Sequence, residues 1–324
     1  MPEPLWIYLM ALLYCTNITT CSAMADAFDS ASPDQLTRLL HGTWSGYTLL
    51  HLALRVLFTV AGGSLIIDDT VVEKPYARIL GEAAWVWSSK HSKVGCGVSV
   101  VLLVWTDGQV RIPLAFRCWQ KGGPSKGELA LELLSYARNR LRCKPQFVLF
   151  DSWYPSKKLL KRLRDYGWSF VWQLKKNRRF EGMPLSRYLW QPYWHATGQL
   201  SGALKVLVVR YRRKYYATNR LSLTATEVRA HYQKRQAVEE VIRPRKSHVS
   251  LEACQAGDRR SRTDPPPARE GVQEHHVALC MVAYLVVERE RLDQGHTWVR
   301  LKRHLILAGS SQILSALERV RQAA

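Results

Sequence analysis

The sequence has 324 residues and a formal net charge of +21, with 47 Lys and Arg against 26 Asp and Glu. A chain of this length can bury a core with a cleft, and so large a basic excess favours a polyanionic partner. The seven cysteines contain no close pair of the zinc-ribbon type, which argues against a structural zinc site or a disulfide framework and favours reduced thiols in the cytoplasm.

Residues 1–62 are predicted to form a helical N-terminal region, because apolar residues recur there at helical spacing. The first apolar segment, LWIYLMALLYC, follows an acid and no base and is too short to cross a bilayer. We therefore expect a buried helix there, not a secretion signal or a membrane anchor. Arg38 and Arg55 are the only strong bases among the first 64 residues, so the basic surface must come from later segments.

Residues 63–176 are predicted to form a layered α/β domain. The segment LIIDDTVV predicts a buried strand, and GCGVSVVLLVWT and QVRIPLAF, joined by DG, predict an antiparallel pair. An amphipathic helix over 126–142, the strand QFVLFD, a short basic helix and the strand WSFVWQL follow. This order of strands and helices is typical of a mixed sheet with helices packed against it.

The remaining chain is predicted to contain four segments. Residues 177–223 form a β-rich insertion in which bases and aromatics mix, as on a surface that follows a DNA backbone; the alternative is an ordinary strand with its aromatics packed inside. Over 224–255 apolar residues again recur at helical spacing, which predicts a helix that completes the core. Residues 256–272 include three consecutive prolines and are expected to form a loop or a disordered segment, and 273–324 form a helical C-terminal region.

One helix face in the segment YQKRQAVEEVIRPRK carries a stripe of polar residues. At about 100° per residue, Tyr232, Arg235, Glu239 and Lys246 fall within an arc of roughly 60°, beside an apolar arc. Glu240 points away from this stripe and is expected to face solvent. The stripe is either the edge of a cleft or a salt-bridged solvent face, since charged helical faces are common.

Acids at the ends of two predicted strands favour the cleft. Ligands gather at strand ends in layered α/β domains, so LIIDD and QFVLFD each bring a carboxylate to the same region as Glu239. Carboxylates without a histidine or thiol cluster suit hard divalent ions such as Mg²⁺. Two such ions about 4 Å apart can activate a water molecule and stabilise the leaving oxygen of a phosphodiester. The pattern therefore indicates nuclease-type chemistry.

These motifs resemble those of a known family. Tyr, two residues, Arg, three residues, Glu, six residues and Lys form the YREK signature, and LIIDDT and VLFDSWY match two aspartate motifs of the same group. The chain resembles the DDE transposases of bacterial insertion sequences, in the branch related to insertion-sequence family four, from about residue 63 to 255. The resemblance implies an α/β fold with a ribonuclease-H-like mixed sheet flanked by helices, a β-rich insertion and helical N- and C-terminal parts.

The resemblance also implies the roles of the site residues. Asp69, Asp151 and Glu239 would be the catalytic triad and the ligands of Mg²⁺ or Mn²⁺, with two ions expected. The strand pattern alone leaves Asp68 and Asp69 open, and the aspartate motif selects Asp69. The DNA-binding residues, which would contact the phosphates of transposon ends, are Tyr232, Arg235 and Lys246.

The predicted function is therefore cut-and-paste transposition. The expected partners are double-stranded DNA at the inverted repeats and at the target, with a dimer on DNA, no membrane, and a place in the bacterial cytoplasm at the nucleoid. Two alternatives remain open. The chain could be a catalytically inactive remnant that binds DNA, because Pro244 is expected to kink the helix before Lys246 and residues 256–272 look foreign. It could also be a host nuclease of the same fold.

Overall fold

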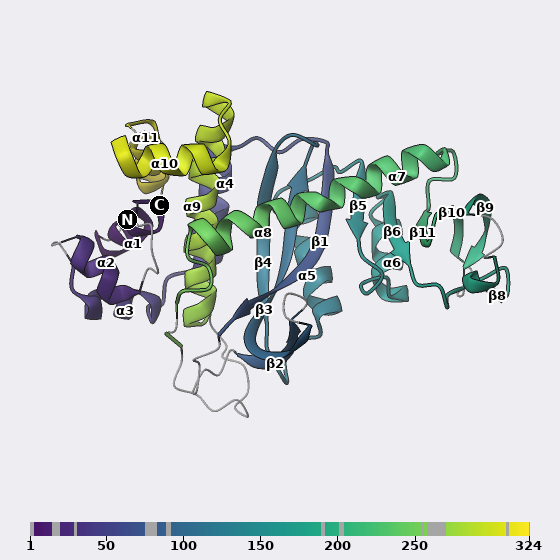
Figure 1. Ribbon diagram of the computed structural model, residues 1–324, viewed down its shortest axis with the longest axis horizontal. Coiled ribbons are helices and arrows are strands. Elements are labelled where there is room, and N and C mark those ends of the chain that lie inside the picture. Colours follow the sequence, from purple (N-terminus) through teal and green to yellow (C-terminus); the bar gives the residue numbers. More distant parts are fainter. Residues whose placement is uncertain are drawn as a thin grey trace.

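The computed structural model describes residues 3–14, 20–28, 31–74, 83–88, 92–188, 192–200, 204–254, 256–257, 270–308 and 311–323. Figure 1 shows helices of both chain ends at one side, a mixed sheet in the middle and a small β region at the other side. The predicted α/β architecture with a mixed sheet is confirmed.

The described residues of the N-terminal region form four helices: α1 (Glu3–Tyr14), α2 (Cys21–Ala27), α3 (Pro33–Leu40) and α4 (Gly46–Leu57). The α3 helix begins where Ser32 and Gln35 form a capping box, with proline at the first helical position. Most apolar side chains of α1 are buried, which confirms the predicted buried helix. Among the described residues, no helix combines the length and apolar character needed to cross a membrane.

The central strand of the sheet is β1 (Ser64–Glu73). It pairs antiparallel with β3 (Lys93–Thr106) and parallel with β5 (Phe147–Phe150), which pairs parallel with β6 (Phe170–Leu174). The far edge of β3 pairs with both β2 (Ala84–Ser88) and β4 (Arg111–Trp119). The predicted DG turn joins β3 to β4, and Gly108 has the positive φ, +114°, that such turns require. Two helices follow β4 and β5, respectively: α5 (Lys126–Asn139) and α6 (Lys157–Asp165).

The strands after β6 continue the same sheet. They are β7 (Arg179–Phe180), β8 (Met183–Pro184), β9 (Tyr193–Leu200), β10 (Leu204–Tyr211) and β11 (Lys214–Thr218), with the short 3₁₀ helix η1 (Leu185–Tyr188) between β8 and β9. Because β11 pairs antiparallel with β6, this β-rich segment joins the edge of the sheet. The division of the chain at residues 177 and 223 stays a prediction.

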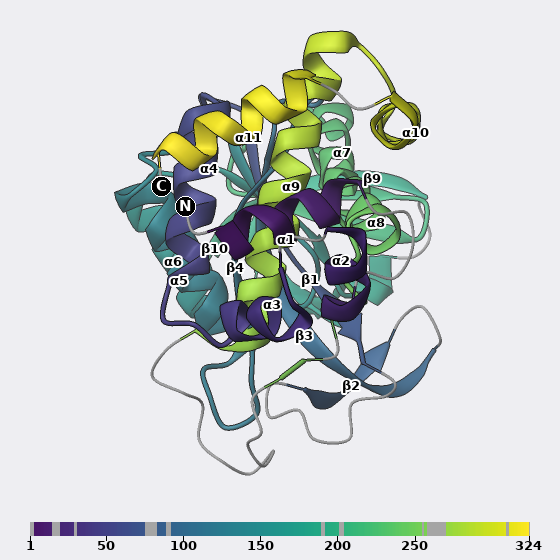
Figure 2. The same ribbon diagram turned by 90° about the vertical axis from the view of Figure 1, so that its left-hand side faces the viewer.

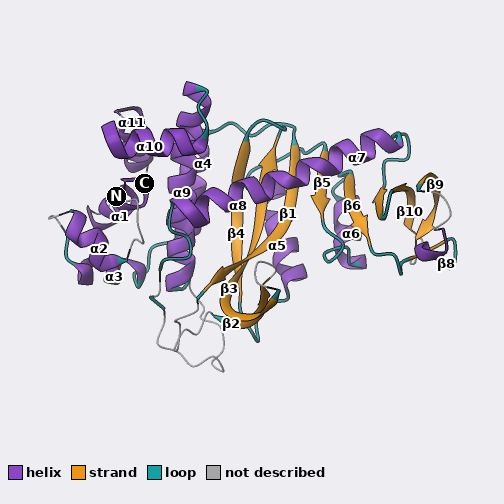
Figure 3. Cartoon of the chain, viewed as in Figure 1, coloured by secondary structure: helices purple, strands orange, loops and turns teal. Residues whose placement is uncertain are grey.

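Helices cover both faces of the sheet (Figures 1 and 3). On one face lie α7 (Ala225–Gln233), the 3₁₀ helix η2 (Lys234–Gln236) and α8 (Ala237–His248), which crosses β1, β3 and β4. On the other face lie α5 and α6. Figure 2 shows α9 (Val272–Gln294) beside α1 and α4, with α10 (Trp298–Ala308) and α11 (Ser311–Ala323) at its end. Most of the segment predicted as a loop, 258–269, lies outside the described residues.

Candidate active site

Two adjacent aspartates of β1 project to opposite faces of the sheet, because successive side chains of a strand alternate. Asp68 accepts a hydrogen bond from the guanidinium of Arg235 in η2. Asp69 accepts a hydrogen bond from Lys126, the first residue of α5, on the other face. The strand therefore divides these two carboxylates between two different environments.

The face of Asp68 also carries Asp151. Ile67 pairs with Phe150 across the parallel strands β1 and β5, so the next residues of these strands, Asp68 and Asp151, are neighbours at the end of the ladder. The negative charge of Asp151 acts on Asp68 and Arg235. The structure thus brings two predicted strand-end acids together beside a guanidinium.

Burial is the main cause that raises the pKa of Asp68 to about 6; Arg235 acts against this rise, and the negative charges of Asp151 and Asp69 add to it. The side chain is only 17% exposed. Two neighbouring carboxylates in a half-buried place are a donor set that a divalent cation stabilises, because the cation relieves their repulsion. The donor set therefore fits a hard metal ion.

Asp69 accepts two hydrogen bonds from side chains, one on each carboxylate oxygen. Its two carboxylate oxygens accept from Lys126 Nζ at 2.6 Å and from the hydroxyl of Tyr154 at 3.0 Å. Burial, followed by the charge of Asp69, raises the pKa of Tyr154 well above its usual value, so the phenol stays a donor. Both oxygens of Asp69 are engaged by side chains of this second face.

The predicted polar stripe of the glutamate helix lines a groove. Tyr232 is buried, and burial raises its pKa to about 12, so it carries a neutral hydroxyl. The groove has a volume of about 670 Å³ and also contains Glu239, which is exposed. The turn between β10 and β11 also lines the groove, with the consecutive cations Arg212, Arg213 and Lys214. Tyr232, Arg235 and Glu239 therefore share one side of the helix, as predicted.

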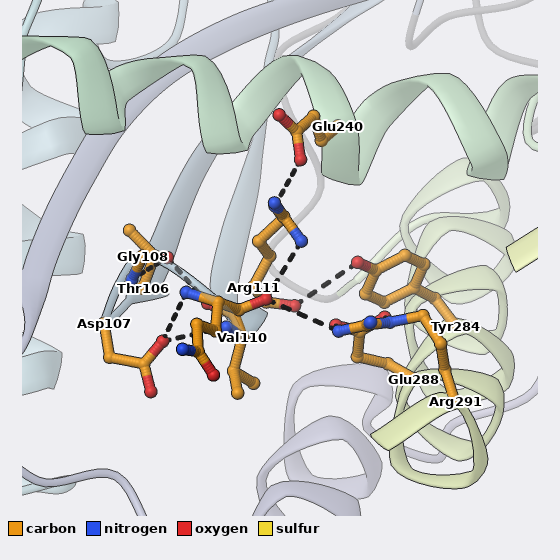
Figure 4. A network of polar contacts seen from close by, with 10 residues as sticks. Thr106, Asp107, Gly108, Val110, Arg111, Glu240, Tyr284, Glu288 and Arg291 are labelled. Carbon is orange, nitrogen blue, oxygen red and sulfur yellow. Dashed lines mark hydrogen bonds and ion pairs between the residues drawn. The ribbon is translucent and has the colours of Figure 1, made fainter. Parts of the chain in front are cut away.

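Glu240 is exposed, as predicted, and it also has a partner that the sequence does not reveal. Its side chain is 45% exposed and forms an ion pair with Arg111 of β4. The carbonyl of Arg111 accepts a hydrogen bond from Tyr284 of α9 at 3.3 Å. Figure 4 shows this network joining α8, the β3–β4 turn and α9. A helical wheel correctly places Glu240 away from Glu239 but carries no information on a partner in a distant strand.

Two predictions about the site stay untested: the DNA contact of Lys246 and the joint binding of metal by three acids. The side chain of Lys246 lies outside the described residues, so its contact with DNA stays a prediction. No group of three His, Cys, Asp or Glu side chains stands close enough to hold a metal ion within the described part of the chain. The joint binding of metal by Asp69, Asp151 and Glu239 also stays a prediction.

Two residues that contact Asp69, Lys126 and Tyr154, were not predicted from the sequence. Tyr154 follows Asp151 by three residues in the motif VLFDSWY, and this spacing was a usable signal. Lys126 begins a helix whose capping box, Ser125 with Glu128, fixes its first turn. Its contact with Asp69 spans 57 residues, so spacing alone could not reveal it.

These strands, the helix across them and the paired acids define a transposase domain. A family model described as "Transposase DDE domain" matches residues 62–263, and the chain belongs to this family of DDE-type DNA transposases. The family generally uses divalent metal ions.

The comparison with solved structures concerns the fold. The chain is similar in fold to piggyBac transposase in a cryo-EM structure of its synaptic complex with hairpin DNA, with a TM-score of 0.57 and 13% sequence identity. The similarity covers 99% of this chain and 75% of that one. No curated protein sequence matches the chain.

Proposed function

We propose that this protein is the transposase of an insertion sequence of the family-four type, which cleaves the ends of its element and joins them to target DNA. The observation that carries the proposal is the pairing of Asp68 with Asp151 at the ends of parallel strands, beside Arg235 and below the helix of Glu239. The core would be ribonuclease-H-like. Five strands support this, in the order β4, β3, β1, β5 and β6. The strand β3 is antiparallel to β4 and β1, and β5 and β6 are parallel to β1.

The metal ligands would be Asp151, Glu239 and one acid of β1. The contacts favour Asp68, because it shares a face with Asp151 and Arg235, whereas Asp69 is engaged by Lys126 and Tyr154. Asp69, the acid selected by the sequence motif, is the alternative. Bound Mg²⁺ or Mn²⁺, with two ions proposed, would supply an activated water and charge stabilisation of the leaving oxygen.

The protein's own residues have three roles in this proposal. Arg235 holds Asp68 in place before metal binds and adds positive charge where a phosphate enters. Tyr232 stays neutral and can donate its hydroxyl proton to a phosphate oxygen, and Lys246 would add a further cation. The cations of the β10–β11 turn line the same groove as Glu239, which suits a DNA backbone held against the carboxylates.

The proposed partners are the inverted repeats of the element and a target duplex. The similar structure is titled a synaptic complex with hairpin DNA, and we propose that this protein likewise brings two ends together as a dimer and excises its element through hairpin ends. Its place of action would be the bacterial nucleoid.

The test uses duplex DNA that contains one end of the element, with Mg²⁺ or Mn²⁺. We expect cleavage at the end and transfer of the cut end into a target plasmid. Binding without cleavage would instead support an inactive remnant, and cleavage without strand transfer would support a nuclease.

A further inference from the structure

The two end strands of the sheet differ in how well they are protected from pairing with another chain. The strand order ends in β8 on one side and in β2 on the other. The strand β8 has only two residues, Met183–Pro184, and its proline has no N–H to donate. The strand β2 has five residues, AWVWS, with neither a charge nor a proline. The edge at β2 therefore lacks the features that usually block strand pairing.

Large apolar side chains are exposed on one face of the β2–β3 hairpin. Trp85 is 67% exposed, Trp87 is 62% exposed and Val94 of β3 is 55% exposed. Trp85 and Trp87 are two positions apart in the strand, so they share a face, and Val94 lies on that face because it pairs with Trp87. Exposed apolar side chains that gather in this way mark a surface that binds a partner.

The hydrogen bonds of β3 determine which backbone groups of β2 point outward. The carbonyl of Cys96 accepts a hydrogen bond from the N–H of Lys74, the residue after β1, at 2.9 Å, so the backbone groups of Cys96 point toward β1. On its other side Cys96 pairs with Trp85. Because backbone groups alternate in direction along an antiparallel strand, those of Trp85 and Trp87 point to the outer edge and those of Val86 point to β3.

The sequence of β2 is symmetric about Val86, with a tryptophan on each side and a small residue, Ala84 or Ser88, at each end. In an antiparallel pair of two such strands centred on Val86, each Trp85 lies opposite the partner's Trp87 and exchanges backbone hydrogen bonds with it. The indole side chains then form cross-strand aromatic pairs on one face. The register that joins the outward backbone groups is therefore also the register that pairs the aromatic side chains.

We propose that β2 is a self-association edge, at which two copies of this chain pair antiparallel, centred on Val86, to form one continuous sheet. A second copy fits this edge better than DNA does, because β2 carries no cation for a phosphate and its sequence is complementary to itself. Among the described residues, those that line the groove beside Glu239 include none of β2, so the pair forms without DNA. The inference is independent of the proposed function, although that function calls for a dimer.

The first test measures the mass of the full chain by sedimentation over a range of protein concentrations. The protein is treated with nuclease and kept in high salt, so that DNA does not bridge two copies. We expect a dimer. Trp85→Thr with Trp87→Thr keeps residues that favour a strand but removes both indoles, and it should weaken dimerisation about a hundredfold.

A matched variant separates this edge from general stickiness of exposed aromatic groups. Trp153→Thr with Tyr193→Thr removes two aromatic side chains of similar exposure, 54% and 59%, from other parts of the surface. We expect this variant to dimerise within about twofold of wild type, because neither residue lies in β2. A wild-type monomer at all concentrations, or equal losses in both double variants, would overturn the proposal.

The second test fixes the register with single cysteines and leaves the tryptophans in place. In the proposed pair the two copies of residue 86 lie opposite each other, with Cα atoms about 4.5 Å apart, which a disulfide can bridge. Residue 84 is on the same face as residue 86, but its two copies lie about 13 Å apart along the strands, too far for a disulfide. Oxidation in air should therefore cross-link Val86→Cys into a covalent dimer that a reductant separates. Ala84→Cys should cross-link no more than wild type, which contains the same native cysteines.

The outcomes separate this inference from the proposed function. A dimer in which Val86→Cys does not cross-link, or in which Ala84→Cys cross-links equally well, would overturn the pairing of β2. Cleavage of end DNA is measured separately. A protein that cross-links at residue 86 but cuts nothing contradicts the proposed function and leaves the interface intact, whereas an active protein without the cross-link contradicts only the interface.

Discussion

The two faces of β1 hold the same side chain in different ways. On the face of α8, Asp68 is buried next to Asp151 and has Arg235 as its cation, and its pKa is raised to about 6. On the face of α5, Asp69 has Lys126 and the hydroxyl of Tyr154 on its two oxygens. One carboxylate is held in a place where negative charge is costly, and the other is compensated.

This difference suggests separate roles for the two aspartates, metal binding for one and positioning of the strand for the other. An acid whose charge is only partly compensated gains most from a metal ion, because the cation removes both the burial cost and the repulsion from a second acid. A compensated acid already has its partners and fixes the strand to the neighbouring helix. We therefore assign metal binding to the Asp68 face and alignment of β1 with α5 to Asp69.

The largest expected effect is on cleavage. Asp68→Asn and Asp151→Asn keep the side-chain shape but remove a metal ligand, so we expect about a thousandfold slower cleavage of end DNA. Asp69→Asn should cost about tenfold, since it disturbs only the alignment of β1. Single-turnover cleavage with Mg²⁺ measures all three. An inactive Asp69→Asn beside an active Asp68→Asn would reverse the assignment of the two faces.

The next effect concerns stability and pH. The folded-state pKa of Asp68, about 6, lies above the ordinary value of about 4, so the folded protein keeps this proton longer than the unfolded chain. Its stability without metal should therefore fall as pH rises from 4 to 6, by up to about 3 kcal/mol. Urea denaturation in EDTA tests this. The difference between wild type and Asp68→Asn isolates the residue, and a constant difference from pH 4 to 7 would contradict the account.

A third prediction compares the two cations. Arg235→Ala leaves Asp68 without its cation and should destabilise the protein by about 2 kcal/mol at pH 7. Adding Asp68→Asn should restore most of this loss, because the uncompensated charge is gone. Lys126→Ala should cost about 1 kcal/mol, since Tyr154 still donates to Asp69. If Arg235→Ala and Lys126→Ala lower the stability equally, and Asp68→Asn does not restore the stability of Arg235→Ala, the two faces of β1 do not differ in how they compensate their aspartates.

The smallest effect is expected at Glu240. Its ion pair with Arg111 is partly exposed, so Glu240→Ala should cost about 0.5 kcal/mol and leave cleavage unchanged within twofold. Thermal unfolding and the cleavage assay measure the two effects. If Glu240→Ala abolishes cleavage while Glu239→Ala does not, the assignment of the helix face is wrong.

Much of this architecture could be predicted from local patterns. The β-branched run LIIDDTVV predicts a strand, and because successive side chains of a strand alternate, Asp68 and Asp69 must face opposite sides. Which face meets the glutamate helix depends on the contact of Asp68 with Arg235, 167 positions later in the chain, and no periodicity contains that information. The motif match selected Asp69, whereas the contacts favour Asp68.

Contacts between distant segments also explain why two other features could not be predicted from the sequence. The β-rich character of residues 177–223 followed from composition, but the pairing of β11 with β6, which merges this segment with the main sheet, did not. The spacing of Glu239 and Glu240 separated their directions correctly. The network of Arg111 with α9 brings together three elements that are distant in the sequence, so the partner of Glu240 could not be predicted.

The most direct measurement is Mn²⁺ binding to the protein in the absence of DNA, by calorimetry at pH 7.5. We predict that wild type and Asp69→Asn bind Mn²⁺ with similar affinity and that Asp68→Asn and Asp151→Asn lose this binding. Undiminished binding in Asp68→Asn, with loss in Asp69→Asn, would contradict this prediction.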